Sequence, residues 1–488
     1  MEKKHLYYED FGAKGDGTTD DFEAMIACHE EANKTGTPVK ARTGATYYIG
    51  GSQKSAIIKT DVDFTGAKIV IDDRCVEKNT SYVFRVLPDS ERYDVSIDSL
   101  KKTDTRIDIA HEGNILVYVC NDEHKMFIRK GLNKNNGTAM NECFTVDADG
   151  NICQPINWNY DKITRAWVRS IDDKPITIKG GTFVTIANQQ ESYYNYLQRG
   201  FEVVRAHVTF SGFEHFVEGE LDHGAPYHGF IRSDFCYDLT IRDALMTPRF
   251  IYWTPSAMPG HMVRMGSYDL SFWSSIDVKC INIKQTIDIS DENYWGIYTS
   301  NFCKDLVLED CVFSRFDAHM GVTNATIRRC KLGHQSVQLI GHGEFLIEDT
   351  EINTPPDGYF KNFIYLRCDY GSLWDGNITV RNCVWNTVGT SIHVIGSNNV
   401  GDHDYGYTCY MGRNITIDGL SIKNGKDTPK ENMSISLFSD CNGAKSGNPY
   451  PYVLPDTVRC RNITVENGTR CYLSTSAENF ENVNVTEE

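Results

Sequence analysis

Near its start the chain reads Asp10-Phe11-Gly12-Ala13-Lys14-Gly15-Asp16-Gly17-Thr18-Thr19-Asp20-Asp21. A helical pattern from Asp21 to about Asn33 follows, and then an extended stretch over residues 39–49. Asp20 or Asp21 is suited to cap the helix, because a carboxylate accepts hydrogen bonds from the free N–H groups at a helix start. Gly36 is suited to end the helix. We therefore expect a short helix beside a strand.

The stretch Asp10–Asp21, with the helix and strand after it, resembles the N-terminal signature of pectate-lyase-like right-handed parallel β-helices, which occur in polysaccharide-cleaving enzymes and phage tailspikes. The resemblance implies a β-helix with a glycan as substrate or ligand. Bare strand edges invite pairing with other chains, so such a stack needs a cap. We assign the aspartates of this stretch to turns and capping, not to catalysis.

The body of the chain repeats a short strand pattern, apolar-x-apolar, from about residue 175 onward. Measured at the last residue of each triplet, the steps are 32, 31, 37, 30, 19, 20, 33, 37 and 48. The steps of 19 and 20 fit one bare coil of a β-helix, and the longer steps fit a coil with an inserted loop. A β-sandwich or a propeller also has regular short strands, but a propeller blade needs about 40 residues. The triplets end at Ile178, Phe210, Ile241, Val278, Leu308, Ile327, Ile347, Val380, Ile417 and Val465.

The 16 cysteines are scattered and do not form a disulfide framework. Cys311, Cys330 and Cys383 each lie three residues after their triplet, and Cys280 lies two residues after its own. Repetition at one position predicts an inward-facing ladder of free thiols, because buried cysteine behaves as a small apolar residue. No Cys/His spacing is typical of a zinc site.

Residues 85–170 do not follow the repeat. Strand patterns over residues 114–119, 143–146 and 163–168 surround a turn at 147–151, which is typical of hairpins. The predicted fold is thus all-β: a right-handed single-stranded parallel β-helix with a short N-terminal capping helix and an inserted antiparallel hairpin region. We divide the chain into the cap and first coils (1–84), the antiparallel insertion (85–170) and the main β-helix with the catalytic groove (171–488).

The composition narrows the partners. With 66 acidic and 49 basic residues the net charge is −17, which argues against nucleic acid and anionic lipid, since both need a basic surface. The 26 tyrosines and 7 tryptophans offer flat amphipathic surfaces for a poly- or oligosaccharide. No apolar run is long enough for a membrane and no signal peptide is visible, so we expect a cytoplasmic protein or the leaderless form of a secreted one. We expect a monomer or a homotrimer.

The best candidate for a site lies between residues 286 and 344. Stacked strands place equivalent residues about 4.8 Å apart, so carboxylates on adjacent coils can form the pair that glycoside hydrolysis needs. Aligning Gly296 with Gly321 sets Glu292 beside Asp317, Tyr294 beside His319 and Trp295 beside Met320. Arg315, Asp317 and His319 alternate and so share one face of a strand.

We expect a catalytic pair formed by Asp317 and a neighbouring acid, one donating a proton and the other acting as nucleophile or activating water. His319 or His334 would tune the charge and hold a sugar hydroxyl. The competing interpretation makes Arg315 and Asp317 a surface ion pair, His319 a turn cap and Trp295 loop packing. The candidate catalytic residues are Asp317, Glu292, Asp291 and His319, and the candidate substrate-binding residues are Tyr294, Trp295, Arg315, His334, Gln338, His228 and Tyr227.

Departures from known enzymes leave the reaction open. Of the motifs of polygalacturonase-type hydrolases only Gly341-His342-Gly343 is matched, and we assign it to a turn between coils. Pectate lyases need an acidic calcium cluster with an arginine base, and no such cluster accompanies Arg242 or Arg264. The leading hypothesis is a glycoside hydrolase without a cofactor. The alternatives are a polysaccharide lyase, for which calcium is expected, and a tailspike-like glycan-binding protein.

Overall fold

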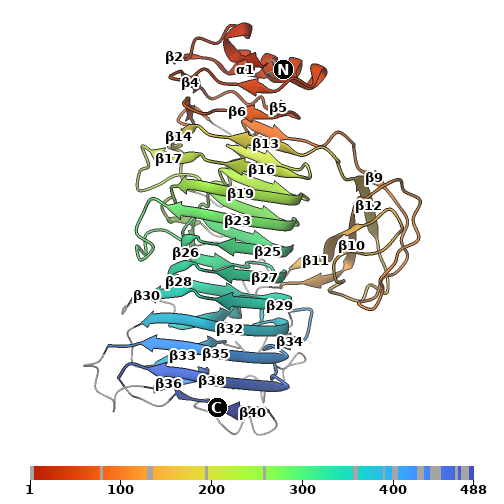
Figure 1. Cartoon of the computed structure of the whole chain (residues 1–488), viewed down its shortest axis with the longest axis vertical. Helices are drawn as coiled ribbons and strands as arrows, with labels where there is room; N and C mark the ends of the chain where they lie inside the picture. The colour runs from red at the N-terminus through yellow and green to blue at the C-terminus, as the bar shows by residue number, and fades with distance from the viewer. Residues whose placement is uncertain are drawn as a thin grey trace.

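The computed structural model describes residues 5–76, 81–128, 136–192, 196–255, 260–355, 361–387, 391–397, 405–425, 434–439, 452–467, 471–473 and 483–487. These residues are almost entirely β structure, with the single α-helix α1 (Phe22–Thr35) and the 3-10 turns η1 (Tyr8–Phe11) and η2 (Cys368–Tyr370). The strands stack in parallel from the N-terminal end of the molecule to its C-terminal end (Figure 1). No helix among these residues has the length and apolarity to cross a membrane.

The parallel strands form three columns, which the chain visits in turn. The first column contains β1 (Leu6–Tyr7), β3 (Val39–Lys40), β6 (Val62–Asp63), β13 (Ile176–Lys179), β16 (Val208–Ser211), β19 (Tyr237–Met246), β23 (Ile276–Gln285), β25 (Cys303–Glu309), β27 (Val322–Arg328), β29 (Gly341–Glu348), β32 (Trp374–Thr387), β35 (Asn414–Lys423), β38 (Thr457–Val465) and β40 (Asn484–Glu487).

The second column contains the C-terminal parts of the longer strands of the first column together with β2 (Asp16–Asp20), β4 (Thr46–Ile49), β7 (Lys68–Asp72), β14 (Thr182–Ile186), β17 (Glu214–Glu218), β26 (Val312–Asp317), β28 (Lys331–Leu339) and β30 (Glu351–Thr354). The third column contains the ends of β26 and β28 together with β5 (Ala56–Ile58), β8 (Phe84–Val86), β15 (Phe201–Val203), β18 (Ile231–Asp234), β22 (Leu270–Trp273), β24 (Tyr298–Asn301), β31 (Asn362–Leu366), β33 (Ser391–Gly396), β36 (Ser434–Phe438) and β39 (Cys471–Tyr472).

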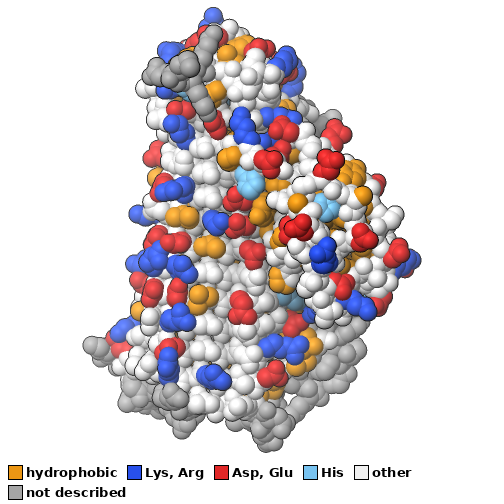
Figure 2. All heavy atoms as spheres, turned by 45° about the vertical axis from the view of Figure 1, so that its right-hand side comes forward, with side chains coloured by type: hydrophobic (Ala, Val, Ile, Leu, Met, Phe, Trp, Pro, Cys, Tyr) orange, Lys and Arg blue, Asp and Glu red, His pale blue; other side chains and the backbone are white. Residues whose placement is uncertain are grey.

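Three smaller pairings lie outside the columns. An antiparallel sheet of β9 (Tyr93–Asp94), β10 (Ile115–Met126), β11 (Thr138–Val146) and β12 (Arg165–Ser170) stands out from the side of the stack (Figures 1 and 2). Its base is held by the buried pair Lys304–Glu142, with 2.7 Å between Nζ and Oε2. A hairpin joins β20 (Tyr252–Pro255) to β21 (Met262–Met265), and β34 (Cys409–Tyr410) pairs in parallel with β37 (Tyr452–Val453).

The register confirms eight of the ten predicted triplets as members of the first column. The shortest coils, from Leu306 to Ala325 and on to Phe345, are the predicted steps of 19 and 20 residues. Two triplets are wrong. Val278, not Ile276, pairs with Leu239, and Val458 pairs with Ile415 in place of Ile463. In β23 the apolar alternation begins two residues before the true triplet. In β38 a second apolar-x-apolar pattern, at residues 463–465, follows the corner at Asn462, so the pattern alone does not fix the register.

The corner between the first and second columns has a left-handed residue in ten successive coils. These residues have φ between +49° and +84°, a conformation that suits Gly, Asn and Asp best because other side chains clash with the backbone there. They follow the strand pattern directly and fix where each coil turns. They are Gly180, Gly212, Asp243, Asn282, Asp310, Arg329, Asp349, Asn382, Gly419 and Asn462.

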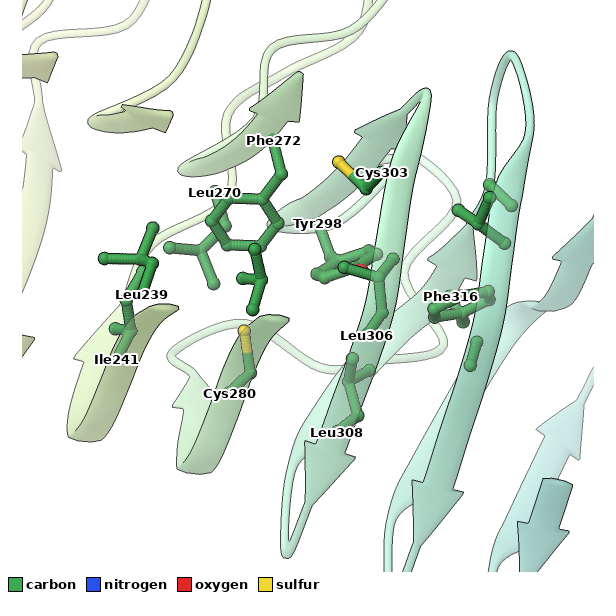
Figure 3. Packing of buried hydrophobic residues seen from close by; sticks show 14 of the residues in the cluster. Leu239, Ile241, Leu270, Phe272, Cys280, Tyr298, Cys303, Leu306, Leu308 and Phe316 are labelled. Atoms are coloured by element: carbon green, nitrogen blue, oxygen red, sulfur yellow. The ribbon is translucent and has the colours of Figure 1, made fainter. Parts of the chain in front are cut away.

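The core lies inside the stack, where the columns face one another (Figure 3). Leu306 and Leu308 of β25 point inward together with Phe272 and Tyr298 of the third column, and all four side chains are buried. Cys311, Cys330 and Cys383 are free and buried in one row, in which Thr350 stands between Cys330 and Cys383. The predicted thiol ladder is thus confirmed for these three, whereas Cys280 lies beside Leu308 in another row.

The helix α1 lies at the N-terminal end of the stack, as a cap would (Figure 1). Asp21 precedes it, but its carboxylate accepts hydrogen bonds from the backbone N–H groups of Lys14 and Gly15, at 2.6 and 3.0 Å. Asp20 instead accepts from Phe22 N at 3.0 Å, so the expected cap comes from Asp20. Gly36 ends the helix with φ +68°, as predicted. The aspartates of the opening stretch therefore bind the backbone.

Candidate functional site

The candidate site lies on the third column, where β26 and β28 pass between β24 and β31. Ser300 pairs with Ala318 in parallel, Asp317 pairs with Gln338, and Gln338 pairs with Tyr365. The apolar neighbours Phe316, Val337 and Ile364 are buried in the core. Since side chains alternate along a strand, the polar residues between them project to the outer side of the stack.

Asp317 lies at the centre of this group of polar side chains, and its own side chain is fully buried. Arg315 Nη2 lies 2.8 Å from Asp317 Oδ2, and Arg367 Nη1 donates to Asp317 Oδ1 at 2.5 Å. The hydroxyl of Thr299 donates to Oδ2 at 3.1 Å. Arg315 and Asp317 are therefore buried and joined to a third residue, and do not form the surface ion pair of the competing interpretation.

The two arginines keep Asp317 ionised. Burial by itself would raise the pKa of Asp317, but the charges of Arg315, Arg367 and His319 outweigh it and hold the pKa below its usual value. Arg367 also binds Asp369, with Nη2 3.0 Å from Oδ2. Although burial would lower the pKa of Arg367, the charges of Asp369 and Asp317 hold it above its usual range. A carboxyl group in this setting cannot serve as a proton donor near neutral pH.

The register corrects one prediction. Alignment of Gly296 with Gly321 is wrong, because the bridge between Ser300 and Ala318 places Thr299, not Glu292, beside Asp317. Asn301 consequently lies beside His319, and its Oδ1 accepts a hydrogen bond from His319 Nδ1 at 3.0 Å. The two coils differ by an inserted loop before β24, so the two glycines have different places in their coils. Glycine spacing alone does not reveal such an insertion.

Aromatic rings enclose Arg315. Its guanidinium lies 5.2 Å from the centroid of Tyr268 and 5.3 Å from that of Trp295, close enough for cation–π attraction. Nη2 donates to the Tyr268 hydroxyl at 2.9 Å, and Nη1 donates to Gln335 Oε1 at 2.7 Å. Gln338 Nε2 also donates to Gln335 Oε1, at 3.0 Å. Of the predicted binding residues, the structure thus brings Arg315, Trp295 and Gln338 together.

His334 connects this cluster to the predicted acids. Its Nδ1 lies 3.0 Å from the carbonyl oxygen of Ile289, and its Nε2 lies 3.3 Å from Gln335 Nε2. Burial lowers the pKa of His334, while the charges of Glu292 and Asp291 act in the opposite direction. Glu292 is exposed and Asp291 is half-buried on the loop before β24. The two acids are therefore near His334, at the edge of the cluster around Asp317.

Two predicted residues belong to other surroundings. Tyr227 is buried under Arg249, whose guanidinium lies 3.6 Å from the ring centroid. His228 lies 3.4 Å from the Tyr82 hydroxyl, and burial, followed by the charge of Arg232, lowers its pKa to about 3. The segment Gly341-His342-Gly343 is also corrected. Gly341 and His342 begin the strand β29, and the centroid of the His342 ring lies 4.5 Å from that of Trp158, on the segment between β11 and β12.

The sequence prediction missed Arg367, Tyr268 and Tyr370. The sequence signal for Arg367 is that it follows Ile364-Tyr365-Leu366, whose alternation is like that of Phe316-Asp317-Ala318. Because the coils differ in length, this signal does not show that the two strands stack in one column. Tyr268 comes from a loop, and Tyr370, whose hydroxyl lies 3.4 Å from His319 Nε2, ends the turn η2. The approach of such connecting segments to the strands has no sequence signal. Among the described residues no group of three or more His, Cys, Asp or Glu side chains is arranged to hold a metal ion.

Comparison with known proteins supports the fold. No model of a protein family matches the sequence, and no curated protein is significantly similar to it in sequence. In structure the chain is similar to the tailspike of Pseudomonas phage phi297 (TM-score 0.59, 11% identity, 99% of this chain and 84% of that chain covered). It is also similar to the tailspike of Acinetobacter baumannii bacteriophage AP22, solved in complex with A. baumannii capsular saccharide (TM-score 0.52, 11% identity, 99% and 79% covered). At 11% identity these two similarities concern the fold alone, and they agree with the stack of parallel strands described above.

Proposed function

We propose that this protein acts on a poly- or oligosaccharide as a glycoside hydrolase, at the outer side of the third column. The observation that carries the proposal is the cluster in which Arg315 lies against the rings of Trp295 and Tyr268 and pairs with Asp317. Aromatic faces suit sugar rings, and arginine and carboxylate groups suit their hydroxyls. The similarity in fold to a tailspike that was solved with a capsular saccharide supports the same substrate class.

In this proposal Asp317 is the ionised carboxylate that holds Arg315 and Arg367 in place at the site. Asp291 and Glu292 are the carboxylates nearest to the edge of the cluster and are the candidates to activate water. His319 and Gln338 would hold sugar hydroxyls. The right-handed single-stranded winding, the division at residues 84 and 170, and the monomeric or trimeric state remain predictions.

The test is a screen of natural polysaccharides and oligosaccharides with wild type and Asp317→Asn, in which new reducing ends are measured. We expect cleavage by wild type and an activity lower on the order of 10²–10⁴-fold in the variant, because the charge that holds the two arginines in place is lost. Asp288→Asn, on the exposed part of the same loop as Asp291, is the matched control and should keep full activity. Thermal unfolding of each variant shows whether it is folded.

Three results would contradict the proposal. Full activity of folded Asp317→Asn removes Asp317 from the site. An unsaturated product that absorbs in the ultraviolet identifies a lyase. Binding of a glycan without cleavage by wild type identifies a glycan-binding protein of the tailspike kind.

A further inference from the structure

A pair of charged residues on β18, Arg232 and Asp234, lies outside the cluster around Asp317. Arg232 Nη2 lies 3.5 Å from Asp234 Oδ2, and the Arg232 guanidinium lies 5.3 Å from the centroid of the Trp273 ring. Ser233 between the two is buried, so both charged side chains project to the outer side of the third column. Trp273, the neighbour of Asp234 on β22, is half-buried, and the side chains of Arg232 and Asp234 are 12% and 29% exposed. All three residues can therefore meet a ligand.

The same arrangement occurs at two more places along the third column. Each place has an arginine, an aspartate two residues later that pairs with it, and an aromatic ring against the guanidinium. The distances from the arginine nitrogen to the carboxylate oxygen are 2.8 and 3.0 Å there, and those from the guanidinium to the ring centroid are 5.3 and 5.7 Å. The two places are Arg315 with Asp317 and Trp295, and Arg367 with Asp369 and Tyr370. The column thus repeats one kind of recognition chemistry.

We infer that Arg232, Asp234 and Trp273 form a second sugar-binding subsite, which holds a distal sugar of the same chain that reaches Asp317. The inference rests on the proposed function and adds to it the length of the substrate. That substrate is an extended polysaccharide or a long oligosaccharide, whose successive sugars meet repeated side chains.

The strand register gives the spacing between the two subsites. Arg232 pairs with Ser271 on β22, and Ser271 pairs with Thr299 on β24. The hydroxyl of Thr299 donates to Asp317 Oδ2 at 3.1 Å. Three strand-to-strand steps of about 4.8 Å place the two subsites about 14 Å apart on one row. All four side chains of the row over this span are polar, which suits the hydroxyl groups of a chain that runs along the column.

The chemistry of the distal subsite suits a sugar. The guanidinium donates hydrogen bonds and the carboxylate accepts them, so the pair can bind adjacent hydroxyl groups. The indole ring offers a flat apolar face to the C–H groups of a sugar ring. Glu202, in register with Arg232, pairs with Arg85 at 2.5 Å between Oε2 and Nε. Because positive and negative groups balance here, the subsite suits a neutral sugar better than a polyanion.

The antiparallel sheet fixes the backbone of both strands of the distal subsite. Cys143 Sγ donates to the carbonyl oxygen of Ser274 at 2.9 Å, and Arg169 Nη2 donates to that of Phe235. Ser274 and Phe235 are the residues directly after the indole ring and the carboxylate of the subsite. A site that is ordered before the ligand arrives loses less conformational entropy on binding.

The experiment uses the full chain and a length series of oligosaccharides from any polysaccharide that wild type cleaves. Trp273→Leu removes the aromatic face, so we expect KM to rise about 3–10-fold for the long members, which reach the distal subsite. The shortest member that is cleaved should keep the wild-type KM, and kcat should be unchanged, because the subsite is remote from the bond that breaks. Arg232→Gln should have the same effect. Arg92→Gln, whose guanidinium lies 5.2 Å from the ring of Trp167 on the antiparallel sheet, is the matched control and should behave as wild type.

The outcomes separate the inference from the proposed function. A wild-type KM for every length in folded Trp273→Leu and Arg232→Gln overturns the inference and leaves the hydrolase standing. A KM that rises equally for short and long members also overturns it, because such a change is not local to the distal subsite. If Trp273→Leu does not fold, Arg232→Gln decides alone by the same measure.

Two results reach the proposed function itself. If wild type binds the oligosaccharides without cleaving them, the hydrolase is overturned, and a Kd that rises in the variants for the long members alone still supports the distal subsite. If wild type neither cleaves nor binds any glycan, the proposed function and the inference are both overturned.

Discussion

Some buried charged residues of this molecule pair with a residue from a distant part of the chain. Arg199 Nε lies 2.6 Å from Asp73 Oδ1, and both side chains have at most 2% exposure. Arg199 also donates to the carbonyl oxygens of Gly50 and Ser52. Burial raises the pKa of Asp73, and Arg199 counteracts this. The pair ties the first coils to the coil of β15.

Replacing Arg199 by Met should lower the free energy of unfolding by about 3–5 kcal/mol, because a buried charge loses its partner. Urea unfolding measures the change. Arg165→Gln breaks the exposed pair with Asp122 and is the control, with an expected loss below about 1 kcal/mol. Equal losses in the two variants would contradict the difference in burial.

Sequence alternation predicts part of the candidate site. The alternation of Arg315, Asp317 and His319 predicted correctly that they share a face. It did not predict that Arg367, some 50 residues later, binds Asp317, because coils of different length separate the two residues.

At the scale of the element, one row of the first column alternates in charge. Glu309, Arg328, Glu348, Arg381, Asp418 and Arg461 are in register on six successive strands. Glu348 accepts from Arg328 Nε at 3.0 Å and lies 3.1 Å from Arg381 Nη1. Charged side chains of both signs are interspersed along the outside of the stack (Figure 2). Because a shift of one coil would place like charges together, the row favours the observed stacking order.

Glu348→Lys should destabilise the fold by about 1 kcal/mol, because it places three cations in one row. The loss should shrink when the salt concentration is raised, since exposed charges are screened. Denaturant unfolding of wild type, Glu348→Lys and the neutral control Glu348→Gln at low and high salt gives the comparison. A loss in Glu348→Lys that does not depend on salt would contradict an electrostatic cause.

At the scale of the whole molecule, three neutral histidines are enclosed at different heights of the stack. They are His29 in the cap helix, His228 before β18 and His342 beneath the antiparallel sheet, and burial is the first cause that lowers the pKa of each to about 3. In an unfolded chain a histidine has its unperturbed pKa of about 6.5. Between these two values the unfolded chain binds more protons than the folded one, so stability must fall as the pH falls.

We therefore expect the thermal midpoint to decrease progressively between about pH 6.5 and pH 4. His29→Gln can keep a hydrogen bond to the Tyr8 hydroxyl, which lies 3.0 Å from His29 Nε2, and should weaken this dependence. The measurement is calorimetry across the range for both proteins. A midpoint that is constant from pH 7 to pH 4, or an equal slope in the variant, would contradict the role of buried histidine.

The sequence by itself determined the column of strands, the cap at its N-terminal end and the row of buried thiols, because each depends on local patterns: apolar alternation, a helix with its glycine stop, and repeated spacing. Only the tertiary structure decided which outward residues meet. Loops of different length separate the coils, so partners such as Thr299 and Asp317, or Glu220 and Tyr252, come together through register and loop packing. Hydrogen bonds between strands fix that register, and apolar spacing alone allows a strand to slip by two residues without exposing its core face.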